Sequence, residues 1–187
     1  RIRKKRIIEL PKDCIPESIK EAYDIQDELT NKYISADKNT FLIGKKIGCT
    51  NKAAQTQLNV KESFFGNMFS NNISKSNCII NSEEYFSPFV EPEFSFVMKN
   101  ELDISKAPYN PEIVYDSVAS VLPSIELVDS RFEDWTIMGV SNLIADNAVH
   151  AHWVYGNEMK NLNDFNFNDH SVDLFINGKL IDKGNSS

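Results

Sequence analysis

The sequence has few cysteines and no long hydrophobic run, and each shortage excludes a class of protein. Its three cysteines, Cys14, Cys49 and Cys78, form no CxxC pair. This pattern gives neither a disulfide framework nor a zinc site, so we expect reduced thiols. No run approaches the ~20 apolar residues of a membrane span, and the start resembles no signal peptide. We therefore expect a cytoplasmic protein that does not bind membranes.

Positive charge is also scarce outside one short segment. The net charge is -7 and the pI is about 5.0, which argues against nucleic acid as a partner. The opening "RIRKKR" is the exception, with five basic residues in six. Such a cluster is found in nuclear or membrane-surface signals. We interpret it as a solvated tail.

Composition and patterning predict one mixed α+β domain over residues 1–187. With 41% apolar and 25% charged residues, the chain is typical of a globular protein with a sizeable core. We expect a helical segment at 1–40 and a β-rich core at 41–187. The elements expected are helices at 16–34, 51–58 (capped by Asn51 or Thr50) and 111–122 (Pro111 in its first turn), strands at 41–50, 93–99 and 123–132, and a hairpin turning at Asn177-Gly178.

Two glutamates stand close together at the start of the strand "VEPEFSFVMK". Glu91 and Glu93 are two residues apart, so on a strand their side chains point to the same face. Phe94, Phe96 and Met98 occupy the opposite face, the pattern of a half-buried strand. Either water solvates both carboxylates or a cation lies between them.

A third glutamate lies in the apolar strand "PSIELVDSRF". Burying Glu126 there costs several kcal/mol unless a cation or strong hydrogen bonds offset the charge. Three carboxylates on two strands would suit Mg²⁺ or Mn²⁺, which prefer oxygen ligands. A solvated acidic face is the alternative that spacing alone leaves open.

The ordered series "KKIGCTNKAAQTQL", "FFGNMF", "VEPEFSFVM", "SIELVDSRFEDW" and "IADNAV" resembles the 2-oxo-4-pentenoate hydratase family and its sister 4-oxalocrotonate decarboxylases. Both belong to the fumarylacetoacetate hydrolase superfamily. The resemblance implies a β-roll or barrel with flanking helices, whose C-terminal part is expected to be absent here because the chain stops at "GNSS". It also implies a homo-oligomer.

The resemblance assigns roles to individual residues. Glu91, Glu93 and Glu126 match the positions that hold a divalent metal, expected to be Mg²⁺ or Mn²⁺. Lys46 matches the lysine expected to pair with the substrate carboxylate or assist proton transfer, and Gly48 beside it is expected to line the substrate site. The matched residues Asp129, Arg131, Asp146 and Asn147 are expected to hold the metal strand in place, whereas His150 and His152 match no ligand position.

The activity implied is metal-dependent addition of water to a small unsaturated 2-oxo acid of the 2-hydroxypenta-2,4-dienoate type, as in catabolism of aromatic compounds. Hydratases of the family usually place an acid where this chain has Phe64. That departure keeps two alternatives open: a 4-oxalocrotonate-type decarboxylase and a degenerate, non-catalytic member. If Glu126 is a ligand, we expect Glu126→Gln to stabilise the metal-free protein by relieving repulsion between carboxylates.

Overall fold

The computed structural model describes residues 5–186, so most of the basic opening segment lies outside the described residues. Helices and strands are both present, as expected for a mixed fold. The helices are α1 (Ile19–Ala36), α2 (Lys52–Gln57), α3 (Pro111–Asp116) and α4 (Val140–Ala145). The strands are β1 (Leu42–Gly48), β2 (Phe64–Phe69), β3 (Ile73–Lys75), β4 (Phe89–Met98), β5 (Val118–Val128), β6 (His150–Tyr155), β7 (Ser171–Ile176) and β8 (Lys179–Asn185).

Short 3₁₀ helices connect many of these elements. They are η1 (Lys12–Cys14), η2 (Ser82–Glu84), η3 (Ile104–Lys106), η4 (Trp135–Ile137), η5 (Asn147–Val149) and η6 (Leu162–Asp164). No disulfide joins the three cysteines. Within residues 5–186, no helix has both the length and the apolar character needed to cross a membrane.

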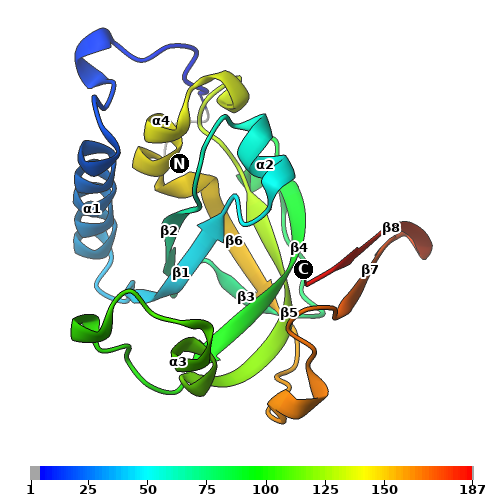
Figure 1. The fold of residues 1–187 in the computed structure, drawn as a ribbon. Helices are drawn as coiled ribbons and strands as arrows, with labels where there is room; N and C mark the ends of the chain where they lie inside the picture. Colours follow the sequence, from blue (N-terminus) through cyan, green and yellow to red (C-terminus); the bar gives the residue numbers. More distant parts are fainter. Residues whose placement is uncertain (1–4, 187) are drawn as a thin grey trace. The chain divides into compact units, whose positions relative to one another are not determined.

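Three sheets organise the strands, which Figure 1 traces along the chain. β1 pairs with β2, β7 pairs with β8, and a four-stranded sheet has the order β3-β6-β5-β4. Contacts between residues divide the chain into two compact units. Among the described residues, the first contains 5–74, 78–90 and 126–153, and the second contains 75–77, 91–125 and 154–186. Strands β3, β4, β5 and β6 have residues in both units.

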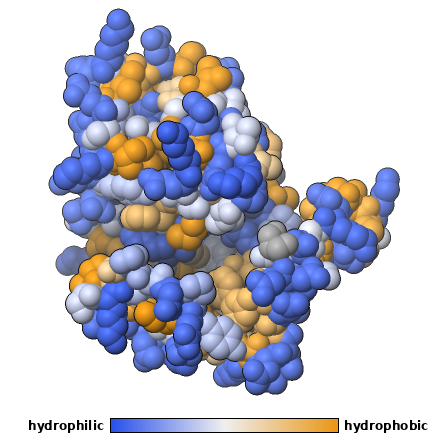
Figure 2. Space-filling model, in the orientation of Figure 1, coloured by the Kyte–Doolittle hydropathy of each residue, from blue (hydrophilic) through white to orange (hydrophobic). Residues whose placement is uncertain are grey.

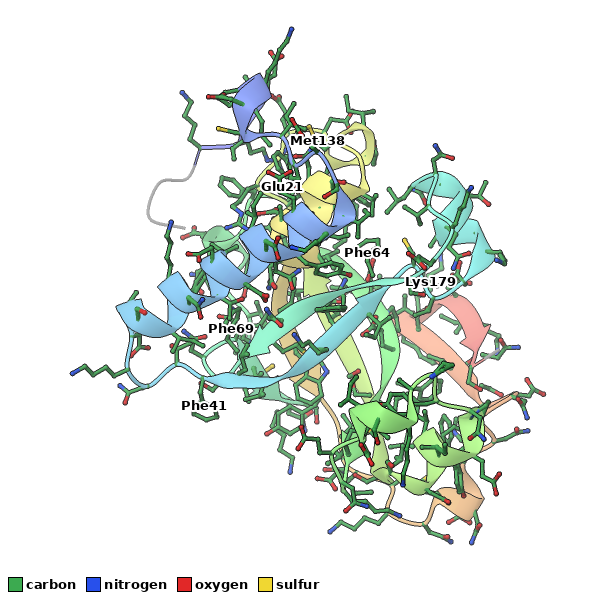
Figure 3. All side chains as sticks on the ribbon, turned by 60° about the vertical axis from the view of Figure 1, so that its left-hand side comes forward. Glu21, Phe41, Phe64, Phe69, Met138 and Lys179 are labelled. Carbon is green, nitrogen blue, oxygen red and sulfur yellow. The ribbon has the colours of Figure 1, made fainter. Side chains whose placement is uncertain are left out.

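In the first unit, α1 packs beside α4 (Figures 1 and 3). The buried face of α1 also reaches β2. Ser18 caps the helix by accepting a hydrogen bond from the Glu21 amide. The buried face includes the polar Gln26, whose Nε2 donates to the carbonyls of Phe65 and Ile144 at 3.0 and 2.8 Å. A polar side chain therefore joins α1 to β2 and to α4.

The outer edge of β2 is bonded to side chains instead of to another strand. The amide of Phe65 donates to the Tyr23 hydroxyl at 3.2 Å, and its carbonyl accepts from Gln26. At Asn67, the amide donates to Asn147 Oδ1 at 2.7 Å, and the carbonyl accepts from Asn147 Nδ2 at 2.9 Å. The Asn147 side chain thus takes the place of a peptide group of a neighbouring strand.

The second unit has a small aromatic core and a hairpin. Val118, Val121 and Phe165 are buried together, and the Phe94 ring packs edge-on against Phe165 at 4.9 Å between centroids. The β7–β8 hairpin turns at Asn177-Gly178, both with positive φ, as expected. Figure 2 shows apolar and hydrophilic side chains together at the hairpin surface. The exposed apolar residues of these strands are Phe175, Ile176, Leu180 and Ile181.

Two local expectations need correction. The helix expected at 111–122 is only α3, and β5 begins at Val118. The apolar run 118–122 fits a helix and a buried strand equally, and pairing into the sheet decides for the strand. The half-buried pattern expected for β4 holds for Phe94, but Phe96 and Met98 are exposed.

The close approach of β2 to the turn after α4 gives a stability prediction. A Cβ on Gly66 would lie 2.4 Å from the backbone oxygen of Asn147, which has no room to move because Asn147 also bonds β2. We expect Gly66→Ala to lower the free energy of unfolding by about 1–3 kcal/mol, measured by chemical denaturation.

Gly44→Ala is the matched control on the partner strand. A Cβ there would meet only Met68 Sδ, at an ordinary 3.8 Å. Because alanine restricts the unfolded chain, this variant should be unchanged or more stable by up to about 1 kcal/mol. Equal effects of the two substitutions would contradict the steric argument.

Candidate functional site

Glu126 on β5 is the centre of a buried charged cluster in the first unit. Its side chain is 1% exposed, and each carboxylate oxygen has a different partner. Oε1 lies 2.7 Å from Nδ1 of His150, and Oε2 lies 3.2 Å from Nζ of Lys46. The buried charge is offset by the ammonium of Lys46 and by one hydrogen bond, with His150, while Oε2 accepts no hydrogen bond among the described residues.

Lys46 reaches Glu126 from the centre of β1. Its side chain is 6% exposed, and Nζ also donates to the Ala148 carbonyl at 3.2 Å. Neighbouring side chains of a strand point to opposite faces, so Lys45 points away from this cluster. Lys45 instead lies over the Phe65 ring at 4.6 Å and bonds Asn67. Burial lowers the pKa of Lys45, an effect that the Asp27 carboxylate partly offsets.

The turn that supplies the Ala148 carbonyl has an unusual backbone. Asn147, Ala148 and Val149 all have positive φ, at 58°, 51° and 55°. This region is rare for residues other than glycine, and for the β-branched Val149 it is a clear outlier. The surrounding contacts keep the backbone in this strained conformation, because Asn147 is bonded to β2 and Ala148 is fully buried. The turn sets the Ala148 carbonyl against Lys46 and leads directly into His150.

Gly48 and Phe64 face each other across the β1–β2 pair. A Cβ on Gly48 would lie 3.1 and 3.2 Å from two Phe64 ring atoms and 3.7 Å from Lys46 Nζ. Glycine at position 48 thus leaves room for the ring beside the lysine. Phe64 itself is buried in a cluster with Ala22 of α1 and Ile144 of α4. It is a core residue that borders the charged cluster.

Glu91 and Glu93 lie on β4, the neighbour of β5 in the four-stranded sheet. Glu91 is exposed, and Glu93 is partly buried. One carboxylate oxygen from each of Glu91, Glu93 and Glu126 can be chosen so that all lie within 4.8 Å of one another. The set contains only hard oxygen donors, which is the donor chemistry that Mg²⁺ and Mn²⁺ prefer.

The residues expected to support the site have identifiable partners. Asp129, just after β5, accepts hydrogen bonds from the amides of Phe86 and Ser87, which precede β4. Arg131 forms an ion pair with Asp146. These contacts fix the chain on either side of the α4 turn and at the end of β5, in line with the structural role expected for them.

His150 is the contact that the sequence did not reveal. Its side chain is 1% exposed and lies against Glu126, whereas His152, two residues further on β6, bonds Ser74 Oγ at 3.0 Å. The pair therefore has separate partners. A histidine two positions before another on a short strand carries no signal for a buried glutamate 24 residues away in sequence.

The Lys46–Glu126 pair gives the second prediction. Removing the ammonium in Lys46→Met leaves a buried carboxylate without its cation, so the metal-free protein should lose about 3–5 kcal/mol of unfolding free energy. Denaturation in excess chelator measures this loss. Lys38→Met, which removes an equal charge from an exposed residue, is the control and should cost less than about 1 kcal/mol. Similar losses in both variants would contradict a specific role for the buried pair.

Comparison with known proteins places this cluster in context. No family model matches the chain. The chain is 30% identical over 164 residues to 2-keto-4-pentenoate hydratase 1 of Dechloromonas aromatica (strain RCB), covering 88% of this chain and 60% of that protein. It is also 30% identical over 167 residues to 2-hydroxypent-2,4-dienoate hydratase of Pseudomonas putida, covering 89% and 70% respectively.

The fold has solved counterparts. The chain superposes on 4-oxalocrotonate decarboxylase from Pseudomonas putida G7, complexed with magnesium and adipate, with a TM-score of 0.84 at 24% identity. This alignment covers 97% of the chain and 67% of the decarboxylase. The chain spans about 60% of the length of the hydratases that it first matches. Sequence and fold agree that the chain belongs to the 2-keto-4-pentenoate hydratase family of the fumarylacetoacetate hydrolase superfamily.

Proposed function

We propose that this chain carries the metal-binding part of a hydratase that adds water to a small unsaturated 2-oxo acid, in catabolism of aromatic compounds. Glu91, Glu93 and Glu126 hold Mg²⁺ or Mn²⁺ in this proposal. The supporting observation is the group of three carboxylates whose oxygens lie within 4.8 Å. Relatives named 2-keto-4-pentenoate hydratase supply the reaction class, and the decarboxylase of similar fold was solved with magnesium.

The donor set fits such an ion. Three carboxylates brought together without a cation repel one another, and a divalent ion removes that cost. When bound, the ion supplies an electron sink for a 2-oxo acid that chelates it through keto and carboxylate oxygens. Two of the three glutamates come from one strand, so β4 sets their separation.

Lys46 is the residue proposed to meet the substrate. Its Nζ has two anchors, the Glu126 carboxylate and the Ala148 carbonyl. If the contact with Glu126 is exchanged for a substrate carboxylate, the bond to Ala148 still fixes the ammonium group. The ammonium then pairs with the substrate or donates a proton to it. Gly48 adds no side chain of its own beside Nζ, where the Phe64 ring is the neighbour.

Decarboxylation is the second candidate, and Phe64 favours it. An apolar ring borders Lys46 at the position where related hydratases usually place an acid. A buried ring gives and takes no proton, so hydration would rely on Lys46 and the ion alone. The β-barrel closure, a homo-oligomer, a location in the cytoplasm and the single-domain organisation stay predictions.

The third prediction tests Glu126 as a ligand. Glu126→Gln should weaken Mn²⁺ binding, measured by calorimetry, by at least about tenfold, because it removes one of three negative charges. Millimolar Mn²⁺ should raise the unfolding temperature of the wild type more than that of the variant. Glu101→Gln removes an equal charge from an exposed residue and should bind Mn²⁺ as the wild type does.

The metal-free state of the same variant should respond in the opposite direction to the sequence-based expectation. Relief of repulsion was expected to stabilise it, but Glu126 is paired with Lys46, so the substitution leaves a buried ammonium without its anion. Glu126→Gln should therefore be less stable than the wild type in chelator. Equal Mn²⁺ shifts in both proteins, or a preference for Zn²⁺ at His150 and His152, would overturn the proposed site.

The fourth prediction concerns the reaction. We expect Phe64→Asp, which places a carboxylate near Lys46, to raise turnover of 2-hydroxypenta-2,4-dienoate relative to 4-oxalocrotonate, with Mg²⁺ present. Phe64→Leu is the control that keeps the position apolar, and it should leave the ratio unchanged. Because Phe64 is buried among Ala22, Ile144 and Ala148, both variants need a folding check by circular dichroism. The same ratio in all three folded proteins would mean that Phe64 serves packing only.

A further inference from the structure

We infer that His150 is a positioning residue that fixes the orientation of the Glu126 carboxylate, so that Oε2 is the oxygen left to exchange partners. The inference rests on the proposed metal site and adds a residue that the family resemblance does not supply. Glu126 makes two contacts of different kinds, one with the imidazole of His150 and one with the ammonium of Lys46.

The contact to His150 is the more rigid of the two. Nδ1 lies 2.7 Å from Oε1, and both side chains are 1% exposed. A carboxylate only accepts hydrogen bonds, so Nδ1 carries the hydrogen and donates. The imidazole ring has two rotatable bonds and starts from β6, a strand inside the four-stranded sheet. Oε1 is thus held by a donor that has little freedom to leave.

The contact to Lys46 is more easily exchanged. Nζ lies 3.2 Å from Oε2, at the end of a four-carbon stem with several rotatable bonds. Its second bond, to the Ala148 carbonyl, survives a small movement away from Glu126. A divalent ion held by Glu126 would compete with the Lys46 ammonium for this carboxylate, because two cations at one oxygen repel each other. His150 therefore keeps the carboxylate in place while Lys46 exchanges.

The other nitrogen of His150 supports this assignment. Nε2 is buried and has no hydrogen-bond partner among the described residues. Nε2 therefore makes no direct hydrogen bond that opposes donation from Nδ1. His150 borders a cavity of about 30 Å³ whose lining also includes the side chains of Tyr33, Asn72, Asp129, Arg131, Asp146 and Asn147. This volume suits one water molecule with polar partners, so a smaller side chain at position 150 can be tolerated.

The fifth prediction uses two substitutions of equal shape. Asparagine places an amide donor where Nδ1 of histidine lies, whereas leucine has the same outline without a donor. His150→Leu should weaken Mn²⁺ binding by about 10–100-fold, the usual range for residues that orient metal ligands, and His150→Asn should stay within about threefold of the wild type. Calorimetry with Mn²⁺ alone measures both constants, and unfolding in chelator reports the stability of each variant separately.

The controls separate positioning from packing and from failure of the site itself. His152→Asn changes the other histidine of β6, which bonds Ser74, and should bind Mn²⁺ as the wild type does. If His150→Leu does not fold, His150→Gln replaces it, since its amide reaches the Nε2 position instead of Nδ1. Wild-type affinity in a folded Leu or Gln variant, or equal losses with Asn and Leu, would overturn the role of His150 alone. Absence of Mn²⁺ binding by the wild type would overturn the proposed function.

Discussion

The first unit is organised around one buried carboxylate that must be compensated. Glu126 is held by Lys46 from β1 and by His150 from β6, so three strands are tied together by one charge. Isolated, such a charge would cost several kcal/mol, and with both partners the cost is offset. The same compensation applies to each partner, because the side chains of Lys46 and His150 are only 6% and 1% exposed. Removing any one of the three leaves the other two in an unfavourable environment.

The strained turn at 147–149 is part of the same arrangement. Its Asn147 side chain bonds β2, its Ala148 carbonyl receives Lys46, and the next residue is His150. Residues 147–149 all have left-handed backbone conformations, which cost free energy that these contacts must offset. The close approach of Gly66 to Asn147 leaves the turn no room to relax. The strained residues 147–149 therefore lie next to the buried charged cluster, both in sequence and in space.

The sequence correctly predicted the structural features that depend on local chemistry. The α1 periodicity, the Asn51 cap of α2 and the Asn177-Gly178 turn are encoded within a few residues, and all are present. The apolar neighbours of Glu126 raised the question of a buried charge without deciding it, and the residue is 1% exposed. The predictions that failed concern residues whose partners are distant in sequence. Residues 118–122 become strand by pairing in a sheet, and Gln26 is buried on α1 because β2 offers it a carbonyl. The contact between His150 and Glu126 is of the same kind.

The side-chain bonds along β2 have a consequence for association between molecules. An unpaired strand edge is a template on which another chain can add a strand, and proteins must block it. At Phe65 and Asn67, the outward backbone groups are already taken by Tyr23, Gln26 and Asn147. The β2 edge of this sheet is thus closed to edge-to-edge growth by amides and a phenol, without the charged or proline residues often used. These side chains act as gatekeepers against aggregation at this edge.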